Sequence, residues 1–594
     1  MNLYEPPGAV WRYIMDIIKK MRYILNRKQK LHICFLGVLI FIGGLLETLS
    51  VSAVLPIVYV IISPEQALEN KYIRMVMDAL EIDSIEGFIV PLLGALIVMY
   101  ILKNAFLLLL VHEQNRFILM NRNKLISQVL REFLNRPYEF YLDADIPTVF
   151  RLTDSDIPNV FNILMAMISL VSEGIVFALL CIVMVLTDWK LLLFLIIVFG
   201  ILSFVILKVL KPLLSRLGEK NQSIQSRIAK WRIQAIYGIK DVKVLHREAF
   251  FADNYENSGR IGAGYARRHA VLNNTPRLLI EAVFMTSILS YIILYIQMGN
   301  DASTLIPMLS AFGVAAIRMM PSVNRINTYM TDISYFRPCL DYVYENMNIN
   351  EISRKTNQTL KPADISKTMQ LHDRISLKGI VYAYPNTSKL IFDHADMVIP
   401  YGKSVGIMGP SGAGKSTIVD ILLGLLTVQE GSITCDGENI FDNYPAWLAQ
   451  IGYIPQSIYL VDEPVRNNIA FGIADEEIDD SRIWQALEEA QLADFIRGLP
   501  QGLDTAIGDR GVRISGGQRQ RLGIARALYH NPEILVFDEA TSALDNETEA
   551  AVMEAINSFH GRKTMVIIAH RLNTIEKCDI IYKVDEGKIQ ETRL

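Results

Sequence analysis

The segment from Val405 to Thr417 contains the residue types that bind phosphate groups. A short apolar run leads into a GxxxxGKS loop and then into an apolar helix start. In such a loop the backbone N–H groups wrap phosphate oxygens, the lysine reaches the β- and γ-phosphates, and the serine hydroxyl binds Mg²⁺. The residues predicted to bind a nucleotide here are Gly409, Pro410, Ser411, Gly412, Ala413, Gly414, Lys415, Ser416 and Thr417.

A second element places two carboxylates at the end of an apolar run. Residues 534–537 read Ile-Leu-Val-Phe and are followed directly by Asp538 and Glu539. A buried strand that ends in this way can hold Mg²⁺ or its water through Asp538, and Glu539 can polarise the water that attacks the γ-phosphate. The pair therefore extends the prediction from nucleotide binding to hydrolysis.

A third motif, Ile514-Ser515-Gly516-Gly517-Gln518, resembles the LSGGQ signature of ATP-binding-cassette proteins, with Ile514 in place of the usual leucine. Further cassette elements occur in the order that the family has. They are Tyr384 before the phosphate loop, Gln456 in Ile-Pro-Gln, residues 542–545 (Ser-Ala-Leu-Asp) after the acidic pair, and His570.

This resemblance implies a role for each element. Tyr384 would stack on adenine, Gln456 would sense Mg²⁺ and the γ-phosphate, and His570 would contact the γ-phosphate. Glu539, His570 and Gln456 would be the catalytic residues, and Ser416, Gln456 and Asp538 would hold magnesium. Ser515, Gly516, Gly517 and Gln518 would complete the ATP site of a second chain, because N–H groups at a helix start form another anion site.

The order of elements predicts two kinds of domain. From about residue 376, short β-branched runs alternate with helical stretches, which is typical of an α/β P-loop domain. Apolar, charge-poor runs occur only before about residue 322. We expect an interfacial helix region at 1–30, a domain of six transmembrane helices with long cytoplasmic extensions at 31–345, a linker at 346–372, and a nucleotide-binding domain at 373–594.

The composition supports membrane residence. The 594 residues are 51% hydrophobic and only 20% charged, which argues against a disordered or nucleic-acid-coating protein. A helix needs about 20 apolar residues to cross a bilayer. The runs that reach or approach this length are 32–63, 88–111, 162–186, 191–209, 277–297 and 304–321.

Lysine and arginine in the connections predict the orientation. Residues 1–30 contain a basic cluster, whereas the connection 64–87 has only Lys71 and Arg74, and the next connection is basic again. Basic loops stay in the cytoplasm, so we expect a multi-pass protein of the inner (cytoplasmic) membrane with its N-terminus and nucleotide-binding domain in the cytoplasm. Trp11, Ile14, Ile18, Met21 and Leu25 predict an interfacial helix before the first span.

Six spans followed by one cassette resemble a half-size exporter, which implies a homodimer that binds ATP and Mg²⁺ at two sites. Ionisable residues inside the spans are costly, and they mark a cavity or an ion pair. Each is by itself typical of a structural pair or a snorkelling head group, but together they predict a polar cavity. They are Glu47, Lys103, Glu173, Glu281 and Arg318, with Arg277 and Arg325 near span ends.

Residues 315–326 resemble the sixth span of bacterial lipid-linked oligosaccharide flippases of protein N-glycosylation. Arg318, Arg325 and Arg277 are candidates for binding an anionic headgroup, because arginine suits phosphate recognition. Tyr72, Ile73, Val76, Met77 and Leu80 would form an outer helix that touches the polyprenyl tail, or a plain amphipathic cap. We therefore expect ATP-driven flipping of a polyprenyl-pyrophosphate-linked oligosaccharide.

Two alternatives use the same nucleotide site. One is an ATP-driven exporter of another lipid, a peptide or a drug. The other is an ATP-gated regulatory or channel-like protein, which is disfavoured because Glu539 and His570 are both present. A nucleic-acid partner is not expected for a chain with six spans.

Overall fold

The computed structural model describes residues 9–52, 74–75, 77, 85–143, 146–187, 189–297, 305–357, 369–508, 512–539, 546–569 and 572–593. The chain divides into two compact units. The first, termed the membrane unit, consists of Met1–Asn135 and Asp145–Arg354, and the second, termed the nucleotide unit, consists of Arg136–Ala144 and Lys355–Leu594. The nucleotide unit is therefore discontinuous in sequence.

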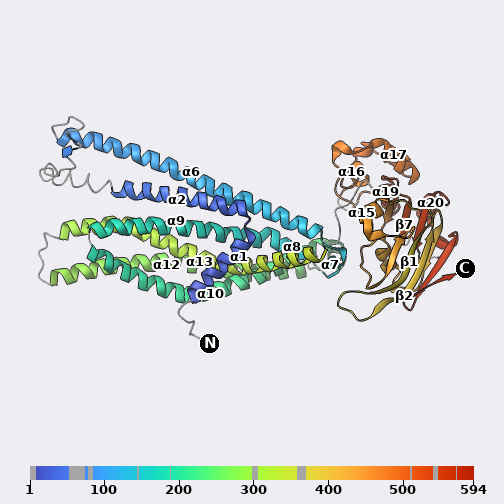
Figure 1. The fold of residues 1–594 in the computed structure, drawn as a ribbon, viewed down its shortest axis with the longest axis horizontal. Helices are drawn as coiled ribbons and strands as arrows, with labels where there is room; N and C mark the ends of the chain where they lie inside the picture. Colours follow the sequence, from blue (N-terminus) through green and yellow to red (C-terminus); the bar gives the residue numbers. More distant parts are fainter. Residues whose placement is uncertain are drawn as a thin grey trace. The chain divides into compact units, whose positions relative to one another are not determined.

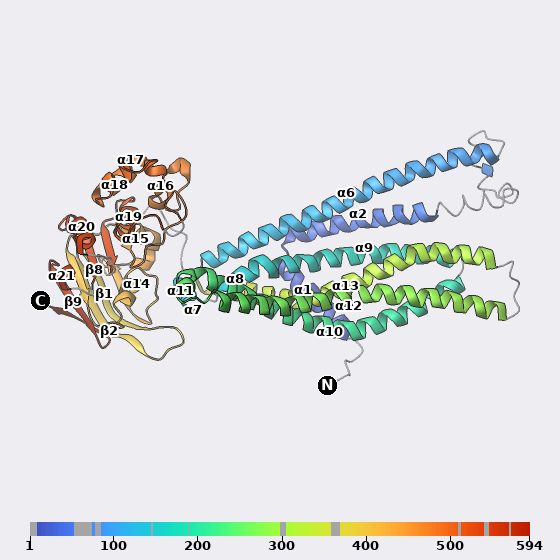
Figure 2. The ribbon, with the colours of Figure 1, turned by 180° about the vertical axis from the view of Figure 1, so that it is seen from behind.

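The membrane unit is helical. Its long helices run side by side, with α2 packed between α6 and α9, and α10 packed on α12 (Figure 1, Figure 2). Its helices are α1 (Ala9–Ile24), α2 (Arg27–Ser52), α6 (Ile85–Leu134), α8 (Ile146–Arg151), α9 (Ile157–Thr187), α10 (Trp189–Tyr237), α11 (Ile239–Val244), α12 (Glu248–Gln297) and α13 (Leu305–Asn357). A π-helical turn, Leu152–Asp156, joins α8 to α9.

Three helical stretches in the described part of the chain are long and apolar enough to cross a membrane, namely Arg27–Ser50, Gly87–Leu134 and Thr148–Ile182. They contain most of the described residues of the first three predicted spans. The other predicted spans, 191–209, 277–297 and 304–321, fall on α10, α12 and α13 except for residue 304, which lies outside the described residues. As membrane crossings these three stay predictions.

Helix α1 occupies the segment for which an interfacial helix is predicted. Met21 and Leu25 are buried, and so is Ile17, whereas Ile18 is 40% exposed. The buried face is thus turned slightly from the face that the spacing suggests. Lys20 fixes the helix to α13 through an ion pair with Asp341, whose carboxylate lies 2.8 Å from its ammonium group.

The nucleotide unit contains two sheets. One is antiparallel with strand order β2-β1-β4-β5, and the other has order β10-β9-β3-β8-β7-β6 and is parallel from β9 to β6. The strands are β1 (Arg374–Ala383), β2 (Leu390–Pro400), β3 (Ser404–Met408), β4 (Glu430–Cys435), β5 (Glu438–Asn439), β6 (Ile451–Ile454), β7 (Ile534–Asp538), β8 (Thr564–Ile568), β9 (Ile580–Asp585) and β10 (Lys588–Thr592).

Short helices surround these sheets. They are α7 (Tyr138–Asp143), α14 (Lys415–Leu422), α15 (Tyr444–Ala449), α16 (Val465–Ile469), α17 (Asp480–Glu489), α18 (Ala493–Arg497), α19 (Gly516–Leu528), α20 (Asn546–Asn557) and α21 (Leu572–Ile575). Of these, α7 lies far from the others in sequence, because it is part of the connection between two long helices of the membrane unit.

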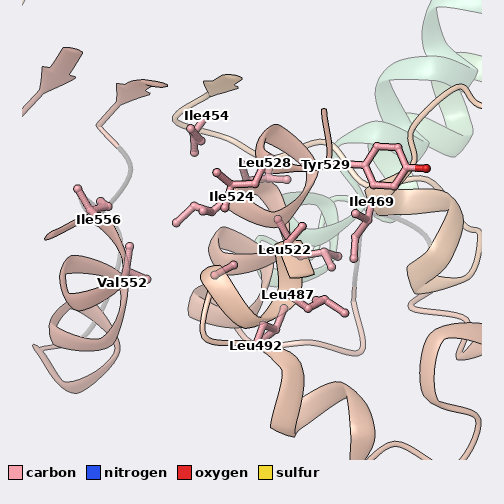
Figure 3. Close-up of a cluster of buried hydrophobic side chains, with 14 of the residues drawn as sticks. Ile454, Ile469, Leu487, Leu492, Leu522, Ile524, Leu528, Tyr529, Val552 and Ile556 are labelled. Carbon is pink, nitrogen blue, oxygen red and sulfur yellow. The ribbon is translucent and has the colours of Figure 1, made fainter. Parts of the chain in front are cut away.

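The parallel strands are buried on both faces, as their continuous apolar runs predict. In β7, Leu535 and Phe537 face one core cluster with α19 and α20, while Ile534 and Val536 face a second cluster that includes α14. Figure 3 shows side chains of the first cluster, including Leu522. This alternation with a period of two confirms the predicted fold class, an α/β nucleotide-binding domain that follows a helical membrane domain.

Candidate nucleotide-binding site

The predicted phosphate loop connects β3 to α14, so its backbone N–H groups lie at the N-terminus of a helix. Gly412 and Gly414 have φ values of +79° and +104°, which side chains rarely adopt. Gly409 is required for a different reason, because a Cβ atom there would lie 2.3 Å from the carbonyl oxygen of Val584. The glycine spacing of the motif thus has a physical cause at each position.

The first two residues of α14, Lys415 and Ser416, follow this loop directly, and their side chains bond to the loop and to β7 respectively. Lys415 is 5% exposed, and its ammonium group donates hydrogen bonds of 3.1 Å to the carbonyl oxygens of Gly409 and Pro410. The hydroxyl of Ser416 donates to a carboxylate oxygen of Asp538 at 3.3 Å. The loop therefore holds a cation and a hydroxyl beside the position predicted for the phosphates.

Asp538 ends β7 at the same edge of the sheet. It is 7% exposed, and the hydroxyl of Tyr453 donates to its second carboxylate oxygen at 3.5 Å. Burial and the nearby charge of Glu539 raise the pKa of Asp538. A positive charge would stabilise the ionised form of this buried carboxylate. The carboxylate of Asp538 and the hydroxyl of Ser416 together offer the oxygen ligands that Mg²⁺ prefers. These residues fit the predicted magnesium site.

Glu539 and Gln456 contact each other. The side-chain amide of Gln456 donates a hydrogen bond of 2.6 Å to a carboxylate oxygen of Glu539. The backbone of Glu539 is left-handed, with φ of +50°, and its N–H donates to the carbonyl of Ile568 on β8 at 3.2 Å. Left-handed backbone in a non-glycine residue costs free energy and is typical of functional positions. Thus two of the predicted catalytic residues meet beside Asp538.

Tyr384 lies close to the same helix start. Its hydroxyl is 2.9 Å from the hydroxyl of Thr417, and its ring packs edge-on against Tyr382 with centroids 5.4 Å apart. Tyr384 is thereby held against α14 at the end of the phosphate loop. That its ring stacks on adenine stays a prediction.

The signature residues form the N-terminus of α19. Ser515 caps the helix, since its hydroxyl accepts from the N–H of Gln518 at 3.2 Å, and the side chain of Gln518 accepts from the N–H of Ser515 at 2.8 Å. Ser515 and Gly516 are exposed, whereas Gly517 is buried. A fixed and exposed helix N-terminus can meet an anion that is presented by another molecule.

The remaining predicted site residues are placed less completely. His570 and residues 542–545 lie outside the described residues, as do Tyr72, Ile73, Val76 and Leu80. Arg318 lies on α13, but its side chain is not among those described. Arg277 is exposed on α12, and the guanidinium of Arg325 pairs with Glu173 at 3.0 Å. The charge of Arg325 is therefore already balanced by a carboxylate.

One acidic residue and a tyrosine near the site were not predicted from the sequence. Tyr453 lies on β6, which pairs with β7, so a predicted parallel sheet would have placed it near Asp538. Asp420 lies one turn into α14, and burial together with the charge of Asp538 raises its pKa to about 6. The site thus contains more negative charge than the motifs alone indicate.

Helix α7, which belongs to the nucleotide unit, forms hydrogen bonds with other segments of that unit. The carboxylate of Glu139 accepts from the backbone N–H of Thr427 at 2.6 Å, and Asp143 accepts from the amide of Asn386 at 3.1 Å. Burial and the charge of Asp420 raise the pKa of Tyr138. A segment from the connection between α6 and α9 therefore lies close to the helix that carries Lys415.

Comparisons with known proteins agree with this geometry. A family model described as "ABC transporter" matches residues 392–542, and one described as "ABC transporter transmembrane region" matches residues 66–299. The chain is 32% identical over 430 residues to an ATP-dependent lipid A-core flippase of Cupriavidus metallidurans, covering 72% of this chain and 70% of that protein. It is 41% identical to the Vibrio cholerae protein of the same name over 223 residues, which are 37% and 38% of the two chains.

A solved structure shares the fold across nearly the whole length. The structure of a bacterial Atm1-family ABC exporter with ATP bound superposes with a TM-score of 0.70 at 20% identity, over 96% of this chain and 95% of that one. The match includes both the helical unit and the unit with the phosphate loop. Together, these observations show that the chain belongs to the ABC transporter family, as a half-transporter of the exporter type whose ATPase activity is coupled to transport across a membrane.

Proposed function

We propose that this protein uses ATP to flip a lipid with a phosphorylated saccharide headgroup, of the lipid A-core type, across the inner membrane. The observation that carries this proposal is the extent of the match to lipid A-core flippases. The match of 430 residues is almost twice as long as the predicted nucleotide-binding domain, so it extends into the membrane unit, where a substrate binds. The shorter Vibrio match, of 223 residues, has about the length of a cassette and carries no such information.

The nucleotide site supplies the driving force. ATP would bind between the phosphate loop of one chain and the exposed α19 N-terminus of a second chain. Bound ATP favours closure of the two nucleotide units, and hydrolysis allows them to open again. Magnesium, held by Ser416 and Asp538, would neutralise charge on the phosphates. Glu539 accepts a proton from the attacking water, and Gln456 orients its carboxylate. The proposed working unit is a homodimer with its nucleotide units in the cytoplasm.

The lipid A-core type replaces the polyprenyl-pyrophosphate-linked oligosaccharide as our preferred substrate. The relatives that match the membrane unit have names that refer to lipid A-core, and none of those cited above has a name that refers to a polyprenyl carrier. Both substrates combine phosphate with long hydrocarbon chains, so Arg318 and Arg277 remain candidates for either headgroup. The ion pair of Arg325 with Glu173 makes Arg325 a weaker candidate than its position in the sequence suggests.

The test is the ATPase rate of the purified protein in liposomes, with lipid A-core, polyprenyl-pyrophosphate oligosaccharide, a phospholipid and a peptide mixture added separately. We expect lipid A-core to stimulate hydrolysis most, and we expect Glu539→Gln to abolish the stimulated rate. Stronger stimulation by the polyprenyl lipid would instead support the polyprenyl-pyrophosphate-linked oligosaccharide as the substrate. Stimulation by peptides alone would refute the proposal that the protein flips a lipid. Arg318→Ala is expected to raise the lipid concentration needed for half-maximal stimulation, whereas the exposed Arg216→Ala on α10 serves as its control.

A further inference from the structure

The connection between β6 and α16, residues 455–464, packs directly on α19. We call it the Gln456 segment, because it contains the residue predicted to sense the γ-phosphate. Ile458 and Leu460 are buried in the core cluster that includes the apolar face of α19. A Cβ atom on Gly523 of α19 would lie 2.3 Å from Cδ1 of Ile458, so the absence of a side chain there makes room for Ile458. The segment therefore contacts α19 closely soon after Gln456.

Arg526 of α19 fixes the same segment by hydrogen bonds. Its Nη1 donates to the carbonyl oxygen of Tyr459 at 2.7 Å, its Nε donates to the carbonyl oxygen of Asn468 at 2.7 Å, and its Nη2 donates to the side-chain oxygen of Asn468 at 3.2 Å. The guanidinium also lies 4.7 Å from the centre of the Phe471 ring. Hydrogen bonds from a charged donor are stronger than neutral ones, and a planar guanidinium holds its acceptors in fixed directions. Arg526 thus fixes the position of Tyr459 relative to α19.

Asn468 extends this attachment along the rest of the Gln456 segment. Its side chain is fully buried, and its amide group donates to the carbonyl oxygens of Val461, Glu463 and Pro464 at 3.0, 3.0 and 3.2 Å. Its side-chain oxygen accepts from the N–H of Val461 at 3.1 Å as well as from Arg526. A buried network of this kind is rigid, because breaking any one bond leaves a buried polar group without a partner.

The Gln456 segment and α19 each present a predicted ATP-contacting group. Gln456 lies three residues before Tyr459 and donates to Glu539 of the same chain at 2.6 Å. At the other end of α19, the helix start capped by Ser515 is predicted to complete the ATP site of a second chain. From Ser515 to Arg526 the helix extends about 16 Å, at about 1.5 Å per residue. Hydrogen bonds and rigid helices of this kind can couple distant sites.

We propose that Arg526 is a positioning residue that couples the two ATP sites of the homodimer. It holds the Gln456 segment, which contacts ATP in one site, to the helix whose N-terminus completes the other site. When Gln456 moves toward the γ-phosphate in its own site, α19 moves with it and its N-terminus approaches the ATP of the second chain. The coupling is reciprocal, because both chains contain the same link. This inference rests on the homodimer of the proposed function and does not depend on the transported lipid.

The test is the ATPase rate of the full-length protein in liposomes as a function of ATP concentration. Wild type is expected to show a sigmoidal dependence, with a Hill coefficient of up to about 2 for two sites. Arg526→Met keeps an apolar side chain against Phe471 and removes all three donated hydrogen bonds, so its Hill coefficient should fall to about 1. A loss of folded protein would instead lower the maximal rate and leave the Hill coefficient as in wild type.

The matched control is Arg521→Met on the same helix. Arg521 donates to the carbonyl oxygen of Gln491 at 2.8 Å, which is not part of the Gln456 segment. Its replacement should leave the Hill coefficient as in wild type. Equal decreases in both arginine variants, or a wild-type coefficient in Arg526→Met, would overturn the proposal.

A second variant tests the link with Arg526 intact. Ile458→Ala removes the side chain that packs at Gly523, so it loosens the Gln456 segment from α19 and should also lower the Hill coefficient. It decides the question alone if Arg526→Met does not fold, and an unchanged coefficient in Ile458→Ala would then refute the link.

Light scattering on the same preparations separates this inference from the proposed function. A Hill coefficient of about 1 in wild type refutes the coupling. If the particle then contains two chains, the homodimer stands and only the coupling fails, whereas a single chain would refute the homodimer as well. Two chains with a sigmoidal wild type and a lowered coefficient in Arg526→Met is the expected result.

Discussion

Replacing Glu539 with glutamine removes the ability of this side chain to accept a proton but keeps its size and its position in the site. Glutamine has nearly the same volume, and its side-chain oxygen can accept the hydrogen bond that Gln456 donates at 2.6 Å. The hydroxyl of Ser416 still faces Asp538 at 3.3 Å. We therefore expect ATP and Mg²⁺ to bind to Glu539→Gln about as tightly as to wild type, because the variant loses only the negative charge and the ability to accept a proton.

The size of the effect follows from that loss. A positioned general base contributes about 10²- to 10⁴-fold to a rate, which corresponds to about 3 to 5 kcal/mol of activation free energy. Burial, and then the charge of Glu539, raise the pKa of Asp538, so the variant should also lower that pKa. Mg²⁺ binding in Glu539→Gln is thus expected to persist to a lower pH than in wild type.

The assay is phosphate release by the full chain, measured beside the binding of a fluorescent ATP analogue at several pH values. Gln456→Ala is the control, since it keeps the base and removes its hydrogen-bond donor, and it should reduce the rate less than Glu539→Gln does. A Glu539→Gln variant that binds Mg²⁺ and ATP normally and hydrolyses ATP within tenfold of the wild-type rate would refute the assignment of Glu539 as the base.

Three further predictions concern stability and binding. Glu586, with φ of +45°, and Gly587, with φ of +78°, form the turn between β9 and β10; Glu586→Asn should stabilise the protein by about 1 kcal/mol, seen as a higher unfolding temperature at unchanged ATPase activity, and a lower temperature would contradict it. Gly414→Ala, at φ of +104° and with a Cβ atom 2.8 Å from a neighbouring side chain, should abolish binding of the ATP analogue. The pKa of Asp420 is raised to about 6, so the protonated form is favoured by folding and its stabilisation is lost as the pH rises through 6. Asp420→Asn should therefore flatten the fall in unfolding temperature between about pH 4 and 6.5, while the exposed Asp442→Asn should keep the wild-type slope.

The nucleotide site was predictable from the sequence because its chemistry lies in short, continuous segments. The phosphate loop is a run of consecutive residues, and Asp538 and Glu539 come directly after the apolar run of β7, from which the burial of that strand is evident. Only the meeting of these segments required the structure. It follows from β3, β8 and β7 being parallel neighbours, so that their carboxyl ends share one edge of the sheet.

The features that the sequence did not reveal depend on packing between distant segments. Arg325 has the residue type of a headgroup ligand, yet Glu173 on another helix balances its charge. In α1, periodicity alone cannot decide between Ile17 and Ile18 as the buried position, because adjacent residues on a helix differ by less than a third of a turn. The identity of the transported lipid likewise could not be predicted from the arginines in the predicted spans, because arginine can bind the phosphate of any lipid headgroup.

Helix α7 contacts residues of the nucleotide unit that are synthesised much later, so this contact cannot form until most of the chain has been made. Thr427, whose N–H is bound by Glu139, is made 288 residues later. At about 5 to 20 residues per second, α7 waits roughly 15 to 60 s on the ribosome-bound chain before its contact can form. The connection between α6 and α9 is thus made before its partner, and the nucleotide unit completes its fold only when it binds a segment that is already joined to the membrane unit. A fragment beginning at residue 355 would leave the Thr427 N–H without its carboxylate, so the natural unit for refolding experiments is the whole chain.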